Sequence, residues 1–532
     1  MNTIGAPPVL LISFSFIILL LSVLVKSRNY VYHYLALISS AIVFIVTLYN
    51  LQSVMKSGIP IVYKMGGWPP PIGIVYEVDT LSALLGVLTS LVVLLVVVYS
   101  WWYIDNHPNA PYYYSLLLGL EAGLIGIFYT GDIFNLFVML EVTGITSYAL
   151  VAYYKNNKKA IEAAVKYSLF GLIAGLLYFL ACVLTYSSYG TLTMGFIASL
   201  SRPIYSFVVP DLNYFVWGNI LGATGLILAL CIWTFTFISG VFPNHYWLPD
   251  AHPAAPSPIS AVLSGLVVNA GLYSLSRFFY TIFGIYDEYS LFQSIGFYAK
   301  TLLLVIGCVS MLYASIMMMI QVDVKRLVAY STIVHTSLIF TGISLGGYYA
   351  LKASIYHIVT HSVAKALLFL SVGIVVKLSA TRNIHEVLPL GKKNPILAIA
   401  IILSSLSLIG IPPLAGFFSK LYMYKAFVIS NNYILIAILL ISTGLAVVGY
   451  MKLIYALIFK PEPKTISNEP ANTTYDIRAL LPLIIMMLLL VMLNPFSIDS
   501  ILSKAASELL TPTQYANSAL NKFLEYFLAL GG

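Results

Sequence analysis

Charged residues are scarce in this sequence. Asp, Glu, Lys and Arg together make up 9% of its 532 residues, whereas about 25% is usual in soluble domains. Hydrophobic residues make up 60%, and the mean hydropathy is +0.93. The polar linkers that would divide a soluble chain of this length into domains are also missing. These shortages exclude an ordinary soluble protein and indicate a chain that crosses a lipid bilayer many times.

Cysteine is rare as well. Cys182, Cys231 and Cys308 lie singly inside apolar runs, with no CxxC spacing. This pattern encodes no disulfide framework, zinc site or iron–sulfur cluster. We therefore expect no metal and no cofactor on this chain, and any redox cofactor of an assembly that contains it would belong to another subunit.

Apolar runs of about 20 residues, the length that crosses the hydrocarbon core, recur along the chain. They predict an all-α polytopic membrane protein with about 14 transmembrane helices. The first lacks a basic leading region and a small-residue cleavage site, so we expect a span rather than a signal peptide. The predicted spans are approximately residues 7–25, 31–50, 79–100, 112–129, 133–153, 165–187, 215–239, 257–284, 299–321, 326–345, 349–377, 395–425, 433–459 and 478–496.

Basic residues gather on one set of loops between these spans. Examples are Lys155, Lys158, Lys159, Arg326, Arg382, Lys392, Lys393 and Lys460. Loops rich in Lys and Arg remain in the cytoplasm. We therefore expect a multi-pass protein of the plasma membrane with both termini outside. The overall excess of 27 Lys and Arg over 19 Asp and Glu says little in a membrane chain, so nucleic acid is not an expected partner.

Two predicted spans are interrupted by glycine and proline. The sequence SGVFP occupies 239–243 near the end of the seventh, and GIPP occupies 410–413 within the twelfth. Proline breaks a helix, which a bilayer tolerates only where the freed carbonyls face protein or water. Paired breaks of this kind indicate an inverted repeat with an ion path between half-helices. Simple packing kinks are the alternative.

The few ionisable residues inside spans are the first functional candidates, because each costs about 2.5–3.5 kcal/mol to insert. Glu141 lies near the centre of the fifth predicted helix. A carboxyl group without a partner favours its protonated form there, which suits a residue that binds and releases protons. A neutral carboxyl hydrogen-bonded to a neighbouring helix is the structural alternative. Lys166 at the start of the sixth helix either extends to the membrane interface or pairs with Glu141.

The eleventh predicted helix carries the densest polar stripe. His357, His361 and Lys365 are spaced by four residues and therefore share one face. Three protonatable groups on one face of an apolar helix indicate a proton relay. A metal site is less favoured, because no carboxylate or cysteine follows to complete it. His335 in the tenth helix and Lys420, seven residues after the second break, are candidates for the middle and the exit of the same polar axis.

Two other segments are polar. Residues 242–258 are rich in proline and contain His245, Asp250 and His252. Because proline favours an extended chain, we expect no convergence of these three on a metal. The sequence Asp323-Val-Lys325-Arg326 is interpreted as an anchor at the membrane surface. After Ser497 the chain becomes amphipathic, which is typical of an interfacial helix or of a docking surface for another subunit.

Several motifs, taken together, resemble one family. They are FPNHYWLPDAH (242–252), PSPISA (256–261), DVKRLVAYST (323–332), the stripe from His357 to Phe369, and GIPPLAGFFSK (410–420). The sequence is similar in these to the antiporter-like subunits of respiratory complex I (its L, M and N subunits), of Mrp cation/proton antiporters and of group 4 membrane-bound hydrogenases. The resemblance spans roughly residues 65–460, and GGWPPPIGIVYEVD (66–79) is most similar to the Mrp D and hydrogenase branch.

The resemblance implies 14 helices, two inverted five-helix repeats, discontinuous helices 7 and 12, and a central hydrophilic axis. It divides the chain into N-terminal helices 1–3 (1–111), a first repeat of helices 4–8 (112–284), a second repeat of helices 9–13 (285–460), and the last span with its amphipathic tail (461–532). The family's functional positions correspond to Glu141, Lys166, His361, Lys365 and Lys420.

Two positions depart from the family pattern. The lysine of the seventh helix is replaced by Ile238, and the Lys or His of the eighth helix is replaced by Asn269. Isoleucine cannot carry a proton, and asparagine can only orient water. The first half of the expected path is therefore interrupted at two points, whereas the second half, from His335 to Lys420, is complete.

The leading hypothesis is an ion-translocating subunit of a respiratory or hydrogenase-type complex, or of an Mrp-type antiporter. The expected ions are protons, with sodium linked to them as the second cation. Expected partners are other antiporter-like subunits, small Mrp-type subunits, lipid, and a peripheral redox module on the cytoplasmic side. The alternative is a degenerate subunit that mainly links redox and membrane modules. A stand-alone carrier is the least favoured, and on no hypothesis does this chain itself perform redox chemistry.

Overall fold

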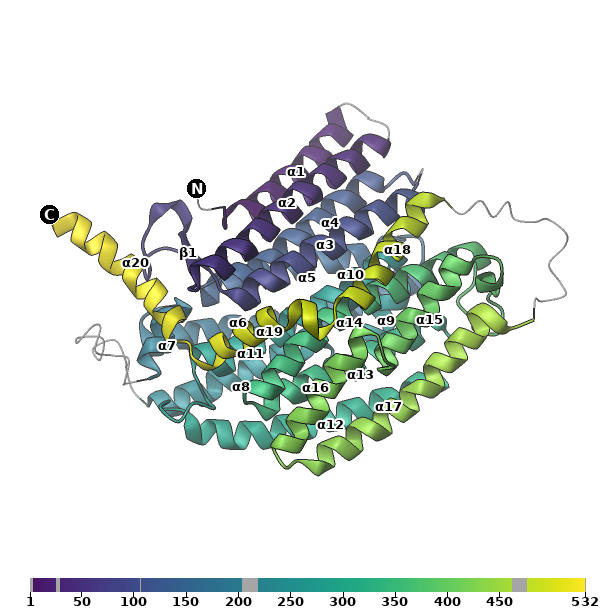
Figure 1. Ribbon diagram of the computed structural model, residues 1–532. Helices are drawn as coiled ribbons and strands as arrows, with labels where there is room; N and C mark the ends of the chain where they lie inside the picture. Colours follow the sequence, from purple (N-terminus) through teal and green to yellow (C-terminus); the bar gives the residue numbers. More distant parts are fainter. Residues whose placement is uncertain (1–2, 25–28, 106, 203–218, 462–475, 532) are drawn as a thin grey trace.

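The computed structural model describes residues 3–24, 29–105, 107–202, 219–461 and 476–531, and these form a bundle of long helices (Figure 1). The N-terminal part consists of α1 (Ala6–Leu24), α2 (Asn29–Ser57), a hairpin of β1 (Ile61–Lys64) and β2 (Val75–Val78), α3 (Thr80–Tyr103) and α4 (Ala110–Tyr129). It is followed by α5 (Ile133–Val151), α6 (Lys158–Tyr189), α7 (Met194–Leu200), α8 (Ile220–Ser239), α9 (Leu248–Ala254), α10 (Ser257–Val262) and α11 (Val268–Ser276). The remaining helices are α12 (Gln293–Ile320), α13 (Val324–Leu345), α14 (Tyr348–Ser379), α15 (Pro395–Ile409), α16 (Ala415–Ile429), α17 (Tyr433–Ile454), α18 (Ile477–Met492), α19 (Pro495–Leu510) and α20 (Thr513–Gly531).

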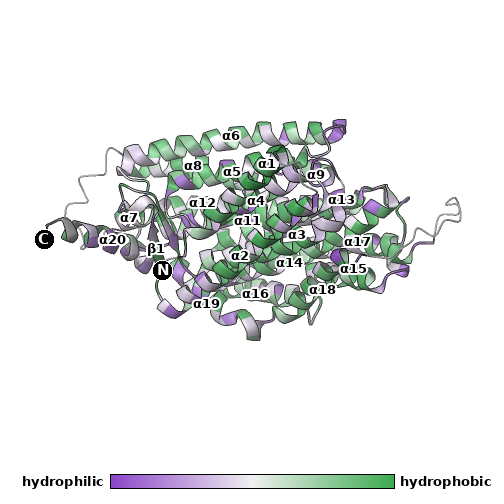
Figure 2. Ribbon diagram, turned by 90° about the horizontal axis from the view of Figure 1, so that it is seen from above, coloured by the Kyte–Doolittle hydropathy of each residue, from purple (hydrophilic) through white to green (hydrophobic). Residues whose placement is uncertain are grey.

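The prediction of an all-α membrane protein is confirmed. Twelve described helices are long and apolar enough to cross a bilayer, and each corresponds to one predicted span. The predicted twelfth span is divided into α15 and α16, and the predicted fourteenth corresponds to α18, which bends by 77° into α19. Residues 215–218 of the predicted seventh span lie outside the described residues. Hydrophobic residues cover most of the length of α6, and hydrophilic residues gather at one of its ends (Figure 2).

Short polar residues fix where several helices begin. The Asp79 carboxylate accepts a hydrogen bond from the backbone N–H of Ser82 at 2.9 Å, and Asp132 accepts one from Asn135 at 2.7 Å. Asp323 caps α13 in the same way. Such caps satisfy N–H groups that have no partner within the helix. These caps determine where α3, α5 and α13 begin. They therefore also determine how far along each helix its functional side chains lie.

Both predicted breaks are present. α8 ends at Gly240 with φ of 64°, and α15 ends at Gly410 with φ of 93°. Glycine adopts this left-handed conformation without steric cost, and so terminates the helix. The proline-rich segment after the first break was expected to be extended, and this was wrong: it forms α9 and α10. Proline is compatible with the first turn of a helix, and both short helices have one there.

The helices differ in how deeply they lie in the bundle. The apolar stretches of α13, of α14 and of the continuous helix Ser257–Ile282 are entirely buried by the rest of the chain. By contrast, only 39% of the apolar stretch of α5 and 33% of the apolar stretch of α6 are buried. Figure 1 shows α1 and α2 at one edge of the bundle, α12 and α17 at the opposite edge, and α14 between them. Most of the candidate residues therefore lie on fully enclosed helices, whereas Glu141 and Lys166 lie near the periphery.

Candidate ion-translocation site

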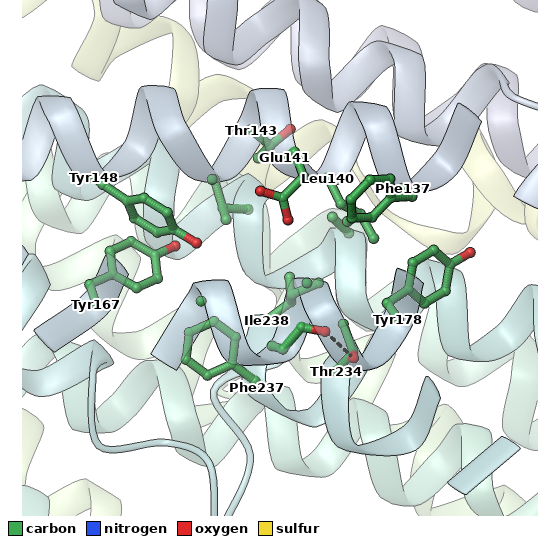
Figure 3. A pocket seen from close by; sticks show the side chains of 16 residues that line it. Phe137, Leu140, Glu141, Thr143, Tyr148, Tyr167, Tyr178, Thr234, Phe237 and Ile238 are labelled. Carbon is green, nitrogen blue, oxygen red and sulfur yellow. Dashed lines mark hydrogen bonds between the residues drawn. The ribbon is translucent and has the colours of Figure 1, made fainter. Parts of the chain in front are cut away.

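Glu141 projects from α5 into a pocket bounded by α6, α8 and α11. The pocket is small, with a volume of about 40 Å³, and Tyr148, Tyr167 and Ile238 line it together with Glu141. Figure 3 shows the carboxyl group pointing across the pocket toward α8, where Ile238 lies. Within the described residues no cation forms an ion pair with Glu141. The position at which the family resemblance implies a lysine therefore faces the carboxyl group and presents an apolar side chain to it.

Glycines on α6 make room for this pocket. A Cβ atom at Gly175 would lie 2.2 Å from Oε1 of Glu141, and one at Gly171 would overlap the hydroxyl of Tyr148. The helices are held together beside them by a hydrogen bond of 2.8 Å from the Thr234 hydroxyl to the carbonyl of Ala174 (Figure 3). The small residues of α6 therefore allow the acidic side chain of α5 to point inward.

Lys166 does not reach this pocket. Its ammonium group lies 2.6 Å from Glu162 and 3.6 Å from Asp250, and 48% of its side chain is exposed. Asp250 also lies 3.5 Å from Arg326. Of the two sequence interpretations, pairing with Glu141 is not observed, and the partners of Lys166 are other acidic residues. A second pocket opens at this end of the bundle and is lined by Lys166, Asp250, Arg326 and Arg382 among others.

Asn269 connects the central helices to one another. Its side-chain amide donates to the hydroxyl of Ser362 at 2.8 Å and to the carbonyl of Gly265 at 2.7 Å. Its own oxygen is buried and has no partner among the described residues. The asparagine therefore occupies the family's protonatable position as a hydrogen-bonding group that links α11 to α14.

The histidines of the second half meet in one cluster. Nδ1 of His335 lies 3.0 Å from Nε2 of His357, and its other ring nitrogen lies 3.1 Å from the hydroxyl of Tyr450. Nδ1 of His357 lies 2.9 Å from the Ser419 hydroxyl. Four side chains from α13, α14, α16 and α17 thus form a continuous hydrogen-bonded chain, and all are buried. Two candidates for the predicted axis, His335 and His357, are thus in direct contact.

His361 and Lys365 continue the same face of α14. The ring of His361 lies 5.6 Å from that of His335, and both of its nitrogens are buried without a hydrogen-bond partner in the described part of the chain. The ammonium group of Lys365 donates to the hydroxyl of Ser331 and, at 3.2 Å, to the carbonyl of Val328. Lys365 is fully buried. Among the described residues its ammonium group is thus held only by neutral acceptors.

Lys420 lies at the second break. Its ammonium group donates to the carbonyl of Ile409, the last residue of α15, at 3.0 Å, and lies 3.4 Å from the Thr443 hydroxyl. Interrupting a helix leaves its last carbonyls without partners. Lys420 supplies one of the missing donors, and it directly follows Ser419, where the histidine chain ends. The break and the protonatable chain therefore meet at one place.

Several other ionisable residues are buried, some of them interpreted differently from the sequence and some not singled out there. Lys325, interpreted as a surface anchor, is 2% exposed and donates to the carbonyl of Ala255 at 2.6 Å, so that interpretation was wrong. His252 is fully buried, and neither ring nitrogen has a partner among the described residues. Glu121 and Arg277 are buried inside predicted spans. The criterion that singled out Glu141, an ionisable residue within an apolar run, would also have found these two.

Comparisons with known proteins agree with this geometry. Residues 130–446 match the family model described as NADH:quinone oxidoreductase/Mrp antiporter, transmembrane. The chain is 30% identical over 481 residues to the D subunit of the Na(+)/H(+) antiporter of Alkalihalophilus pseudofirmus, covering 90% of this chain and 92% of that protein. It is 30% identical over 425 residues to the N subunit of the NADH-quinone oxidoreductase of Desulforudis audaxviator, covering 79% and 80%.

Two solved structures share the fold. A chain of the membrane-bound sulfane sulfur reductase, an archaeal respiratory membrane complex, superposes with a TM-score of 0.85 at 28% identity, covering 98% of this chain and 100% of that one. A chain of the Mrp complex from Dietzia sp. DQ12-45-1b gives a TM-score of 0.81 at 21% identity, with the same coverage. The resemblance inferred from the motifs is therefore confirmed, and the protein belongs to the family of antiporter-like transmembrane subunits shared by NADH:quinone oxidoreductases and Mrp antiporters.

Proposed function

We propose that this chain moves protons across the membrane through its second half. The path consists of Lys365, His361, the pair His335 and His357, and Lys420. One observation carries the proposal: the hydrogen-bonded chain through His335, His357 and Ser419 ends beside Lys420 at the α15–α16 break. Imidazole nitrogens and amino groups are both able to accept and donate protons. The break supplies polar backbone groups that water can reach.

The first half has a different role in this proposal. Glu141 faces Ile238 and lacks an internal cation, and Lys166 is engaged by Glu162 and Asp250. A change of charge at Glu141 therefore has no charged partner in the pocket to act upon. We propose that Glu141 is not required for proton movement along the second half.

The chain works, in this proposal, inside a multisubunit assembly. Relatives are named as subunits of Na(+)/H(+) antiporters and of NADH-quinone oxidoreductases. We accordingly propose other antiporter-like and small Mrp-type membrane subunits as partners, with sodium movement by neighbouring subunits coupled to the protons. The basic loops are placed in the cytoplasm, with the termini outside, because Lys and Arg gather on that side. A peripheral redox module of a respiratory or hydrogenase-type complex would attach on the same side.

The test compares two lysines of one helix. The purified parent complex is reconstituted into liposomes, and proton and sodium uptake are measured during turnover for wild type, Lys365→Met and Lys377→Met. Both residues lie on α14, but Lys377 is exposed near its end. We expect Lys365→Met to reduce proton uptake by roughly a hundredfold, the low end of what a positioned acid or base contributes. Lys377→Met should retain the wild-type rate.

An assembled Lys365→Met complex with wild-type proton uptake would contradict the proposal. That result would favour the alternative of a mainly structural subunit.

A further inference from the structure

A group of buried or partly buried ionisable residues lies at the end of the bundle where both chain termini are found. We call it the hairpin cluster, and it consists of Glu77, Asp79, Arg277, Glu508 and Tyr515. Figure 1 shows β1, α7 and α20 gathered at this end. The cluster combines residues of β2, the start of α3, the end of the continuous helix Ser257–Ile282, α19 and α20. It lies outside the path from Lys365 to Lys420.

Asp79 and Arg277 neutralise one another. Arg277 forms an ion pair with Asp79, and it also donates to the hydroxyls of Ser82 at 2.9 Å and Tyr273 at 3.0 Å. The carboxylate of Asp79 simultaneously caps α3. Although burial acts in the opposite direction, Arg277 holds the pKa of Asp79 below its usual value. The ion-pair partner of Arg277 is therefore Asp79.

Glu508 is compensated separately. Its carboxylate accepts hydrogen bonds of 2.9 Å from the backbone N–H and the hydroxyl of Thr80, and lies 3.8 Å from the ammonium group of Lys504. Thr80 is the first residue of α3. The free N–H groups at a helix start stabilise negative charge. Glu508 thus has both a cation and a helix terminus.

Glu77 has neither. Its side chain is 0% exposed, and neither carboxyl oxygen has a hydrogen-bond partner in the described part of the chain. Its carboxyl group lies between two glycines: a Cβ atom at Gly131 would be 3.3 Å, and one at Gly195 3.5 Å, from Oε2. Burying an unpaired carboxylate is costly, so the neutral acid is favoured. Burial raises the pKa of Glu77 well above its usual value, although Arg277 acts in the opposite direction.

A line of polar side chains on one helix lies between this cluster and α14. Asn269, Tyr273 and Arg277 follow one another at intervals of four residues, and therefore share one face of their helix. At one end of the line Asn269 donates to Ser362, the neighbour of His361. At the other end Arg277 reaches Asp79. The line thus runs from the enclosed histidine cluster toward Glu77.

We propose that Glu77 binds and releases a proton at the terminal end of the bundle, and that the line through Ser362, Asn269 and Tyr273 links its charge state to α14. The ligand is a hydrogen ion. On release the O–H bond of the Glu77 carboxyl breaks, the proton passes to water at this end, and the carboxylate is stabilised by Arg277. The inference rests on the proposed function, because it supplies a terminal group for the same proton movement.

Several other groups influence the titration of Glu77 from the surrounding elements. Asp79 opposes its ionisation and Arg277 favours it. Glu508 with Lys504, and the hydroxyls of Tyr273 and Tyr515, belong to the same region. Their elements are α3, α19, the helix Ser257–Ile282 and α20. In α7 the described residues contain no charged side chain, and Asp132 lies at the start of α5.

The test uses a pair of glutamates in the reconstituted parent complex. Glu77→Gln keeps the size and neutrality of the protonated acid but cannot release a proton. Glu525→Gln is the matched control, because Glu525 lies on α20 with 58% of its side chain exposed. We expect Glu77→Gln to lower proton uptake roughly a hundredfold and to remove its dependence on the pH of the terminal side. Infrared difference spectra during turnover should lose the band of a protonated carboxyl group.

Stability provides a check that the substitution is tolerated. Because the pKa of Glu77 is raised in the folded protein, the folded state holds a proton that the unfolded chain releases above its ordinary pKa of 4.5. Stability therefore falls with rising pH through this window. Glu77→Gln should remove that fall, and the complex should melt at a higher temperature than wild type at alkaline pH.

The outcomes separate this inference from the proposed function. If Lys365→Met abolishes uptake while Glu77→Gln retains the wild-type rate and pH profile, the inference is wrong and the proposed function stands. If neither substitution alters uptake, the proposed function itself fails. If both reduce uptake and the infrared band disappears in Glu77→Gln, Glu77 is a proton-carrying residue.

Discussion

The two halves of the molecule present their ionisable residues in different ways. In the first half Glu141 lies near the periphery, on a helix of which 39% of the apolar stretch is buried, and faces Ile238. In the second half the histidines of α13 and α14 are enclosed on all sides and hydrogen-bonded to one another. The hydrogen-bonded series offers a proton successive acceptors, whereas the Ile238 side chain offers none to the Glu141 carboxyl. Within the same fold, the second half thus contains a connected series of protonatable side chains, whereas Glu141 in the first half has no cation opposite it.

The largest expected effect comes from breaking the connected series. His357→Phe removes both ring nitrogens between His335 and Ser419 while retaining an aromatic ring. We expect proton uptake by the reconstituted complex to fall roughly a hundredfold, because a positioned proton carrier is lost. Tyr356→Phe on the same helix is the control, since the Tyr356 hydroxyl bonds the carbonyl of Leu493 and not the series. Equal rates in the two variants would refute the series as a path.

A smaller loss is expected at the break. Lys420→Met removes the ammonium group from the end of α15, whereas Lys425→Met changes an exposed lysine of the same helix. We expect a several-fold fall in proton uptake for Lys420→Met and none for Lys425→Met. Measuring both in liposomes shows whether the path ends at Lys420. If Lys420→Met lowers the melting temperature but not the uptake, the lysine serves only to satisfy the broken helix.

The comparison can also be sharpened by giving Glu141 a cation. Ile238→Lys introduces an ammonium group into the pocket that Glu141 lines. Residues in contact typically show coupling energies of about 0.5–3 kcal/mol. We therefore expect Glu141→Gln to lower the melting temperature of the detergent-purified Ile238→Lys complex, but to leave that of wild type almost unchanged. Equal shifts in both backgrounds would show that the two positions do not interact.

The smallest effect is expected for Glu141→Gln alone. If the first half takes no part in transfer, proton uptake should stay within about twofold of wild type, because the remaining path through Lys365 is intact. The measurement is the same uptake assay. A loss as large as that of Lys365→Met would show that Glu141 acts despite lacking an internal cation.

Parts of the site were predictable because they depend on local sequence. The spacing of His357, His361 and Lys365 places them on one face of a helix whatever surrounds it. Glycine and proline at 239–243 and 410–413 determine the two breaks, since these residues limit backbone conformation directly. The inverted relation of the two repeats, and the division of the chain that follows from it, remain predictions.

Other parts required the packing of distant segments. Lys325 was predicted at the surface, and only the position of α9 against α13 shows that its ammonium group reaches the carbonyl of Ala255. Lys166 could equally have faced Glu141 until the structure paired it with Glu162 and Asp250. The isolation of Glu77 depends on two glycines, Gly131 and Gly195, from different elements.

By itself, the sequence determined that this protein spans a membrane, where its helices break, and which family it resembles, because hydrophobic length, glycine and proline act over neighbouring residues. The tertiary structure alone decided which ionisable groups meet. His335 and His357 are joined, and Glu141 and Glu77 are left without partners, because each of these environments is built by helices far apart in the chain. In a low-dielectric interior a few ångströms between such helices decide whether a charge is shared or unpaired.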